Sequence, residues 1–197
     1  EITTRLVGSE MCIRDSPYIM LNNYFTVVKN MPDFTPDMYE ALRQTDKDGG
    51  SNIEKKDGVD KYELVASAQN NDKNNGLARL KAAYPNSIWT KYITAGHTSR
   101  NTNSMPFVLN YIRKASRLSG YNLFPFFERW GFLRQVAMYI GDYGNGWCVF
   151  PKAAYDEFKA DMDELVAKGV LKEMPEGMVE EISNTADRFM PKPVFPN

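Results

Sequence analysis

Apolar residues recur at helical spacing along most of the chain, so the sequence predicts a mainly α protein. Apolar positions three and four residues apart share one helix face, and such a face packs against a core. The predicted helices cover residues 17–30, 35–45, 60–69, 77–84, 87–95, 104–118, 122–131, 151–168 and 178–182. The expected fold is an irregular helical bundle, with a short irregular or β-like segment near residues 133–150.

Local capping signals set the expected ends of these helices. Thr35-Pro36 is a strong start, because threonine can accept a bond from a first-turn N–H and proline needs no acceptor there. Ser104 is the expected cap of the helix over 104–118. Asp60 and Glu63 follow the capping-box spacing. Glycines are expected to end helices at Gly120, Gly131 and Gly169.

Two helices have an expected polar side. In the helix over 104–118, Phe107 and Ile112 belong to the apolar face, whereas Asn110, Arg113 and Lys114 lie outside it. The helix over 151–168 combines one apolar stripe with a run of acids, and the simplest interpretation of these acids is a solvated face. The acids are Asp156, Glu157, Asp161, Asp163 and Glu164.

The densest apolar stretch is 119–132, SGYNLFPFFERWGF. Asn122 is placed to cap a short helix, Pro125 falls in its first turn, and Gly131 is placed to end it. Aromatic side chains bury roughly 150–250 Å² each. Several elements are therefore expected to converge on this helix, and its side chains are expected to be core residues.

The run NLFPFFERWGF also resembles the C-terminal signature of the enhancin-like, mucin-degrading zinc metallopeptidases of the accessory-colonisation-factor type. The matching residues are Asn122, Leu123, Phe126, Phe127, Trp130, Gly131 and Phe132. The resemblance implies that residues 17–135 are the helical C-terminal part of a gluzincin-type peptidase domain. Residues 136–197 would then be a C-terminal extension with one amphipathic helix (151–168) and a proline-rich tail.

This resemblance implies a function for a longer parent protein. The parent would be a secreted or cell-surface zinc metalloendopeptidase, a hydrolase that cleaves mucin-type O-glycoproteins. In the family, two histidines of an H-E-x-x-H helix hold zinc and the glutamate activates the bound water. The present chain has one histidine, His97, so it cannot form this motif. We therefore assign it no catalytic or metal-ligating residue and expect no zinc in it.

The expected role of this chain is structural, with the missing N-terminal part of the same catalytic domain as its partner. The alternative is a non-catalytic module that binds glycans or proteins. In that case Tyr143 and Trp147 would stack on a sugar ring, although packing against the aromatic helix is the favoured interpretation for both, because large aromatic side chains are usually mostly buried. A helical interaction domain without a ligand is a third interpretation.

Residues 46–57 leave calcium binding open. Acidic and amide side chains alternate there as in a calcium loop, but Ser51 replaces the turn glycine and Asp57 replaces the bidentate glutamate. A solvated loop between helices explains the same residues.

The first 16 residues need a separate interpretation. The run EMCIRDS resembles the translation of a transposase mosaic-end sequencing adaptor, so we interpret residues 1–16 as an artefact outside the fold. A genuine N-terminal tail is the alternative. On the first interpretation Cys12 is foreign to the protein and leaves Cys148 alone, and the natural N-terminus lies elsewhere.

Charge and composition narrow the choice of partners. The chain has 24 basic and 25 acidic residues and a net charge of −1, which does not favour nucleic acid. No run of 18 apolar residues occurs, so no membrane span is expected.

Overall fold

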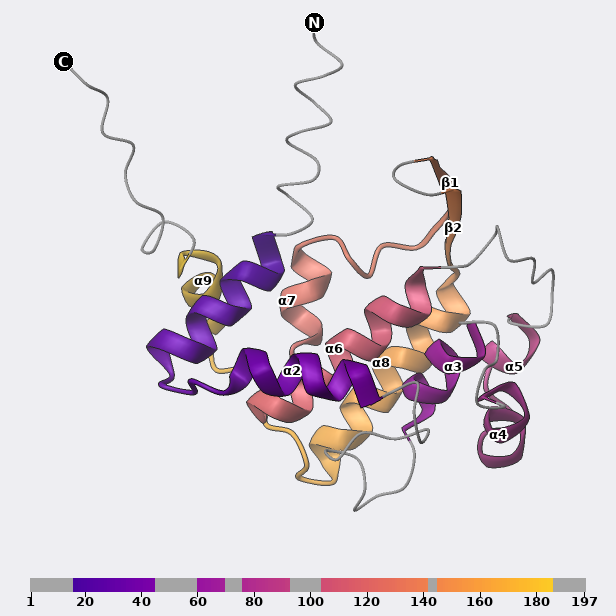
Figure 1. Ribbon diagram of the computed structural model, residues 1–197, viewed down its shortest axis with the longest axis horizontal. Helices are drawn as coiled ribbons and strands as arrows, with labels where there is room; N and C mark the ends of the chain where they lie inside the picture. The colour runs from indigo at the N-terminus through magenta and orange to yellow at the C-terminus, as the bar shows by residue number, and fades with distance from the viewer. Residues whose placement is uncertain (1–15, 45–59, 70–75, 93–103, 142–144, 186–197) are drawn as a thin grey trace, which may run out of the picture. The chain divides into compact units, whose positions relative to one another are not determined.

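The computed structural model describes residues 16–44, 60–69, 76–92, 104–141 and 145–185. These residues are mostly helical and include one small antiparallel sheet, which confirms the predicted fold class (Figure 1). They belong to two compact units, each described by itself. The terminal unit combines residues up to Thr35 with those from Met174 onward, and the helical unit is Pro36–Glu173. The predicted division after residue 135 stays a prediction.

The elements agree closely with the predicted ranges. In the described part the α-helices are α2 (Phe34–Gln44), α3 (Lys61–Gln69), α4 (Gly76–Ala83), α5 (Trp89–Tyr92), α6 (Met105–Ser119), α7 (Phe124–Arg129), α8 (Lys152–Ala167) and α9 (Met178–Ser183). The predicted helix over 87–95 is described only as far as residue 92. No helix in the described ranges has the length and apolarity needed to cross a membrane.

The terminal unit pairs the first helix with α9. Residues 16–23 are α-helical, and the helix continues as the π-helix η1 (Tyr24–Val28). The Tyr24 hydroxyl donates to Glu181 Oε2 at 2.8 Å, and the Thr185 hydroxyl donates to the Met20 carbonyl at 3.1 Å. The two ends of the described chain are thus joined through side-chain hydrogen bonds.

α2 begins one residue earlier than predicted. Thr35 lies inside its first turn rather than before it, and its hydroxyl donates to Asn22 Oδ1. This bond lies within the terminal unit, to which both residues belong.

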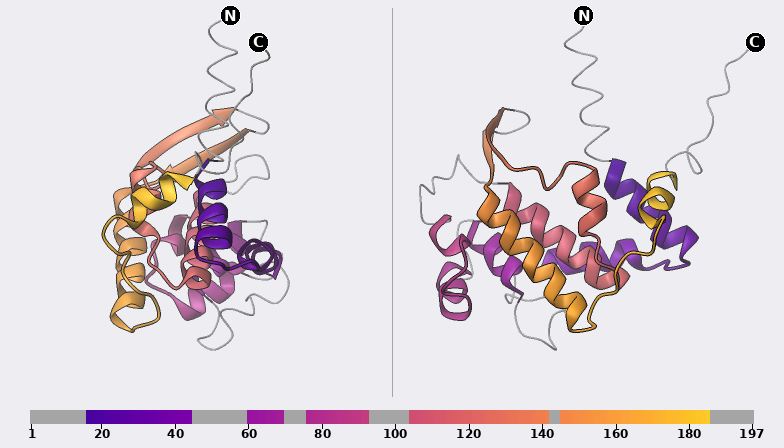
Figure 2. Two further views of the ribbon diagram at one scale, coloured as in Figure 1. Left: turned by 90° about the vertical axis from the view of Figure 1, so that its left-hand side faces the viewer. Right: turned by 180° about the vertical axis from the view of Figure 1, so that it is seen from behind.

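The core of the helical unit lies where α6, α7 and α8 meet. α6 and α8 lie side by side in both figures (Figures 1 and 2). α7 contacts both of them through rings: Phe127 meets Tyr111 of α6 with centroids 6.1 Å apart, and Phe124 meets Phe158 of α8 at 5.9 Å. The predicted convergence of several helices on the aromatic stretch is therefore observed.

The β-like segment is a hairpin. β1 (Val136–Gly141) and β2 (Asn145–Phe150) pair antiparallel, with Val136 opposite Phe150 and Gly141 opposite Asn145. Phe150 is fully buried, whereas Met138 is largely exposed. The end of the hairpin that joins α8 is therefore fixed in the core.

The three predicted helix ends at glycine are confirmed. Gly120, Gly131 and Gly169 all have φ between +71° and +79°, the left-handed conformation that favours glycine. Ser104 is the N-cap residue of α6 as predicted, but its side chain makes no capping bond. Its hydroxyl instead hydrogen-bonds the Cys148 thiol of β2.

The faces of α6 differ from the prediction. Phe107 is 39% exposed, whereas Asn110 and Lys114 are buried. α3 packs against α6, and this contact covers a side that the apolar pattern alone left to solvent. The prediction was wrong because Lys114 has an acidic partner on α3.

Replacing Gly120 with alanine is expected to lower the free energy of unfolding by about 1–2 kcal/mol, the cost of a side chain in the left-handed conformation. Gly120 has φ +76° and ends α6. A Cβ added there meets no atom within 4 Å, so conformation alone determines the loss. Chemical denaturation followed by circular dichroism measures it. No loss in Gly120→Ala, together with a loss in Gly120→Asn, would contradict this reasoning, because asparagine tolerates this conformation better than alanine.

Candidate functional site

The signature residues form the centre of the helical unit. Leu123, Phe126 and Phe127 are fully buried and Asn122 is nearly so. Trp130 and Phe132 are half-buried, and Gly131 is exposed. This part of the chain therefore supplies core volume rather than an exposed reactive group.

Polar groups fix the start of α7. Asn122 Oδ1 accepts the Phe124 N–H at 3.1 Å, and the Ser116 hydroxyl of α6 accepts the Leu123 N–H at 3.1 Å. These bonds satisfy N–H groups that a helix start leaves without backbone partners. The N-cap residue of α7 is Leu123 and not Asn122 as predicted, but the Asn122 side chain still accepts a first-turn N–H from the position before the cap.

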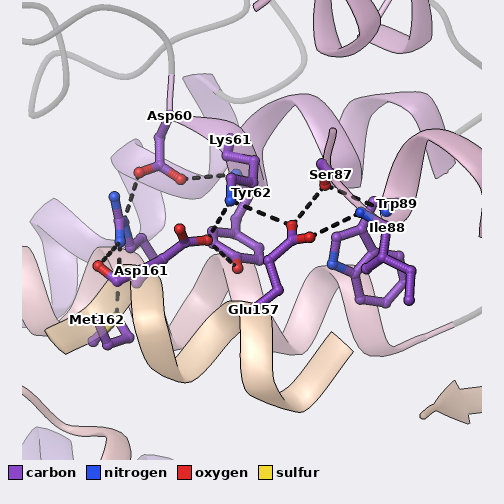
Figure 3. Close-up of polar contacts among 10 residues, drawn as sticks. Asp60, Lys61, Tyr62, Ser87, Ile88, Trp89, Glu157, Asp161 and Met162 are labelled. Atoms are coloured by element: carbon purple, nitrogen blue, oxygen red, sulfur yellow. Dashed lines mark hydrogen bonds and ion pairs between the residues drawn. The ribbon is translucent and has the colours of Figure 1, made fainter. Parts of the chain in front are cut away.

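A second feature is a polar network between α8 and α3. We use this name for Asp60, Lys61, Tyr62, Ser87, Arg113, Glu157 and Asp161. Figure 3 shows Glu157 and Asp161 extending from α8 toward α3 and toward the turn before α5. Asp161 Oδ2 accepts Lys61 Nζ at 2.5 Å and the Tyr62 hydroxyl at 2.6 Å.

Glu157 connects a different segment to α8. Its Oε1 accepts the Ser87 hydroxyl at 2.6 Å, and its Oε2 accepts the Ile88 N–H at 2.8 Å. Lys61 Nζ lies 3.3 Å from Oε1 as well. One carboxylate therefore joins α8, α3 and the residues before α5.

Asp60 and Arg113 extend the network to α6. Asp60 Oδ1 accepts the Tyr62 N–H at 2.8 Å, which caps α3, and Oδ2 accepts Arg113 Nε at 2.6 Å. Arg113 also donates to the Asp161 carbonyl at 3.3 Å. The predicted cap at Asp60 is confirmed.

Glu63 pairs with Lys114 of α6. Glu63 Oε1 accepts Lys114 Nζ, and both side chains are almost completely excluded from solvent. Removing two charges from water costs several kcal/mol each, so such a pair depends on both partners being present.

The hydroxyl group of Tyr62 is buried within the network. Burial raises its pKa well above the usual value, and the negative charge of Asp161 together with the hydrogen bond to it raises the pKa further. Tyr62 therefore stays protonated in the folded protein at pH values that ionise tyrosine in the unfolded chain. This contribution to stability is complete below about pH 10 and is lost as the pH rises toward the folded-state value.

Replacing Tyr62 with phenylalanine is expected to lower the free energy of unfolding by about 1.5–3 kcal/mol at neutral pH, the range for a hydrogen bond to a charged group. It is also expected to make the fall in stability above pH 10 shallower. Urea unfolding between pH 7 and 11 measures both effects. Tyr39→Phe is the matched control, because Tyr39 is 73% exposed. Equal losses in the two variants would contradict this assignment.

The sequence pattern did not reveal this network. It assigned the acids of α8 to a solvated face, which is wrong for Glu157 and Asp161, since both are only partly accessible. Their spacing held a usable signal: both directly precede apolar positions of the stripe, Phe158 and Met162, and are four residues apart on one side of the helix.

The chemistry available here is structural. Each carboxylate of the network already accepts at least two hydrogen bonds from named donors. Groups bonded in this way hold helices in place. Within the described ranges, no three His, Cys, Asp or Glu side chains are grouped so that they could hold a metal ion.

For several residues singled out from the sequence, the structure does not describe the side-chain position. Cys12, His97, Tyr143 and the loop over 46–57 lie outside the described residues. Trp147 belongs to β2, where its backbone pairs with Tyr139, but its side chain is not described. Cys148 is half-buried; burial raises its pKa, and the hydrogen bond from Ser104 partly offsets this.

Comparison of the sequence with models of protein families, with curated proteins and with solved structures gave no match.

Proposed function

We propose that this chain is the scaffolding part of an enhancin-like zinc metallopeptidase that acts on mucin-type O-glycoproteins outside the cell. Its helices would support a neighbouring part of the same domain, and that neighbour would hold the zinc. The chain itself would have no peptidase activity, and none of its residues would have a catalytic or metal-binding role.

The observation that carries the proposal is the signature run with its burial. Seven residues between Asn122 and Phe132 match the family pattern, and the apolar ones among them at positions 123, 126 and 127 are fully buried. A helix of this kind supports a scaffolding role, because large side chains packed against α6 and α8 fix those helices rigidly.

Exposed apolar residues in the terminal unit also favour a missing neighbour. Ile19, Val27 and Val28 of the first helix are each more than two-fifths exposed. Isolated exposed apolar residues are common, but three on one short helix are suited to contact another surface. This support is independent of the signature.

The decisive experiment is to sequence the uninterrupted gene and express the protein it encodes. We expect an H-E-x-x-H motif followed by a glutamate ligand, about one zinc per chain, and cleavage of a mucin-type O-glycoprotein. The chain described here should show neither zinc nor cleavage. A variant of the long protein with the motif glutamate changed to glutamine is the control, and it should bind zinc without cleaving.

Two results would contradict the proposal. One is an intact gene that encodes no such motif. The other is stoichiometric zinc in the present chain.

A glycan-binding module is the second candidate. Trp147 and Tyr139 are partners in the register of the β1–β2 hairpin, so two aromatic residues occur together on a two-stranded element, and aromatic rings are suited to stack on sugars. Titration with mucin glycopeptides tests this function through tryptophan fluorescence. A saturable change that Trp147→Ala abolishes would favour it, and an unchanged spectrum would count against it.

A further inference from the structure

The segment Ser87–Tyr92 is a short piece of chain held against α8. α5 itself is only four residues long, too short to be stable by its own hydrogen bonds. Ser87, Trp89 and Thr90 are nevertheless buried. The segment must therefore be kept in place by contacts with its surroundings.

Glu157 supplies two such contacts. It accepts the Ser87 hydroxyl and the Ile88 N–H through different oxygens. Inside the segment, the Ser87 hydroxyl also accepts the Trp89 N–H at 3.3 Å, and the Ser87 carbonyl accepts the Thr90 hydroxyl at 2.7 Å. Ser87 thus couples the interior of the segment to Glu157, so the segment is held together as one piece.

The buried indole N–H of Trp89 favours opening of the segment. Its ring is 1% exposed, yet no acceptor in the described residues receives its indole N–H. A buried donor without an acceptor is unfavourable, and opening would let water accept this bond. Burial of the tryptophan ring favours the closed position, but the unbonded indole N–H opposes it. The hydrogen bonds to Glu157 therefore contribute to keeping the segment closed.

We infer that Ser87–Tyr92 is a strap that opens as a unit while α6 and α8 stay folded, with Glu157 as the latch that holds it closed. Lys61 of α3 also contacts Glu157, at 3.3 Å, but its shorter contact, at 2.5 Å, is with Asp161. Asp161 is therefore the main partner of α3, whereas the shorter contacts of Glu157, at 2.6 and 2.8 Å, are to the strap. Opening exposes Trp89, whose ring lies 5.9 Å from that of Tyr92 within the strap itself.

Hydrogen exchange of the full chain tests the strap. In Glu157→Ala we expect exchange of the Trp89 indole N–H and of the Thr90 and Lys91 amides to accelerate about tenfold or more, as the loss of hydrogen bonds to a charged group implies. The Ile112 and Ala115 amides of α6 should keep their rates. Glu157→Gln should give a smaller acceleration, because its amide oxygen can still accept one bond. The indole resonance is assigned with Trp89→Phe, since the chain has three tryptophans.

Asp156→Ala is the matched control, because Asp156 is the neighbouring acid on α8 and is exposed and paired with Lys152. It should leave the strap unchanged. Acceleration confined to the Ile88 amide would overturn the inference, since that amide loses its own acceptor in the variant. Equal acceleration in α6 would overturn it as well, because it would mean that Glu157 supports the whole unit.

A second measurement covers the case in which Glu157→Ala does not fold. In the unchanged protein at increasing denaturant, the strap amides should open together and before those of α6. Exchange of the strap at the same denaturant concentration as α6 would overturn the inference.

Discussion

Replacing Lys114 with alanine is expected to lower the free energy of unfolding by about 3–5 kcal/mol, because it leaves the Glu63 carboxylate buried without its cation. Lys114 is fully buried and its ammonium group contacts Glu63. Mesophilic domains have only about 5–15 kcal/mol of stability in total, so this single change removes a large part of it. Urea unfolding followed by circular dichroism provides the measurement.

Two further variants show whether the effect comes from the ion pair. The double replacement Lys114→Met with Glu63→Leu removes both charges and keeps apolar volume, so it should recover most of the loss. Lys152→Ala breaks an exposed pair with Asp156 and should cost at most about 1 kcal/mol. If the double variant were as unstable as Lys114→Ala, the loss would come from packing rather than from an uncompensated charge.

Replacing Phe127 with alanine is expected to cost about 3–5 kcal/mol, the range for deleting a buried aromatic ring from a core. Phe127 is fully buried and its ring meets the rings of Tyr111, Phe126 and Phe132. The cavity would therefore open among several aromatic side chains at once. Thermal and urea unfolding measure the loss.

Phe107→Ala is the matched control, because Phe107 is also a phenylalanine of the same unit but is partly exposed. Its loss should be less than half as large. Phe127→Leu should lie between the two, since leucine fills part of the space. Similar losses in Phe107→Ala and Phe127→Ala would show that the signature helix is not the centre of the core.

Local chemistry made the helix ends predictable. Gly120 and Gly131 take left-handed conformations that few other residues adopt readily, and Asn122 carries an oxygen that can reach a first-turn N–H. These properties depend on a few neighbouring residues, so they can be recognised without the fold. Ser104 is at the predicted cap position, but its hydroxyl bonds a distant group, the Cys148 thiol, rather than a first-turn N–H.

Pairing between distant residues made the polar network unpredictable in detail. Glu63 and Lys114 are 51 positions apart, and Tyr62 and Asp161 are 99 apart. A helical pattern marks such residues as polar and places them on the outer face. Only the packing of α3 against α6 and α8 turns that face inward, and periodicity within one helix carries no information about its neighbours.

The aromatic stretch is an intermediate case. Its density of large apolar side chains predicted a core, and Phe126 and Phe127 are indeed fully buried. Its partners, among them Tyr111 and Phe158, could not be chosen from sequence because many apolar side chains are equally suited to such contacts.

The segment after α8 returns to the start of the aromatic stretch. Lys172 donates its N–H to the Gly120 carbonyl at 2.9 Å and accepts the Asn122 N–H at 2.8 Å, forming a parallel bridge around Tyr121. A shortened version of this protein that stopped at the end of α8 would strip two backbone groups of their partners and remove Leu171, which is almost fully buried. Anyone trimming the helical unit for crystallisation or spectroscopy should therefore retain the chain through Lys172.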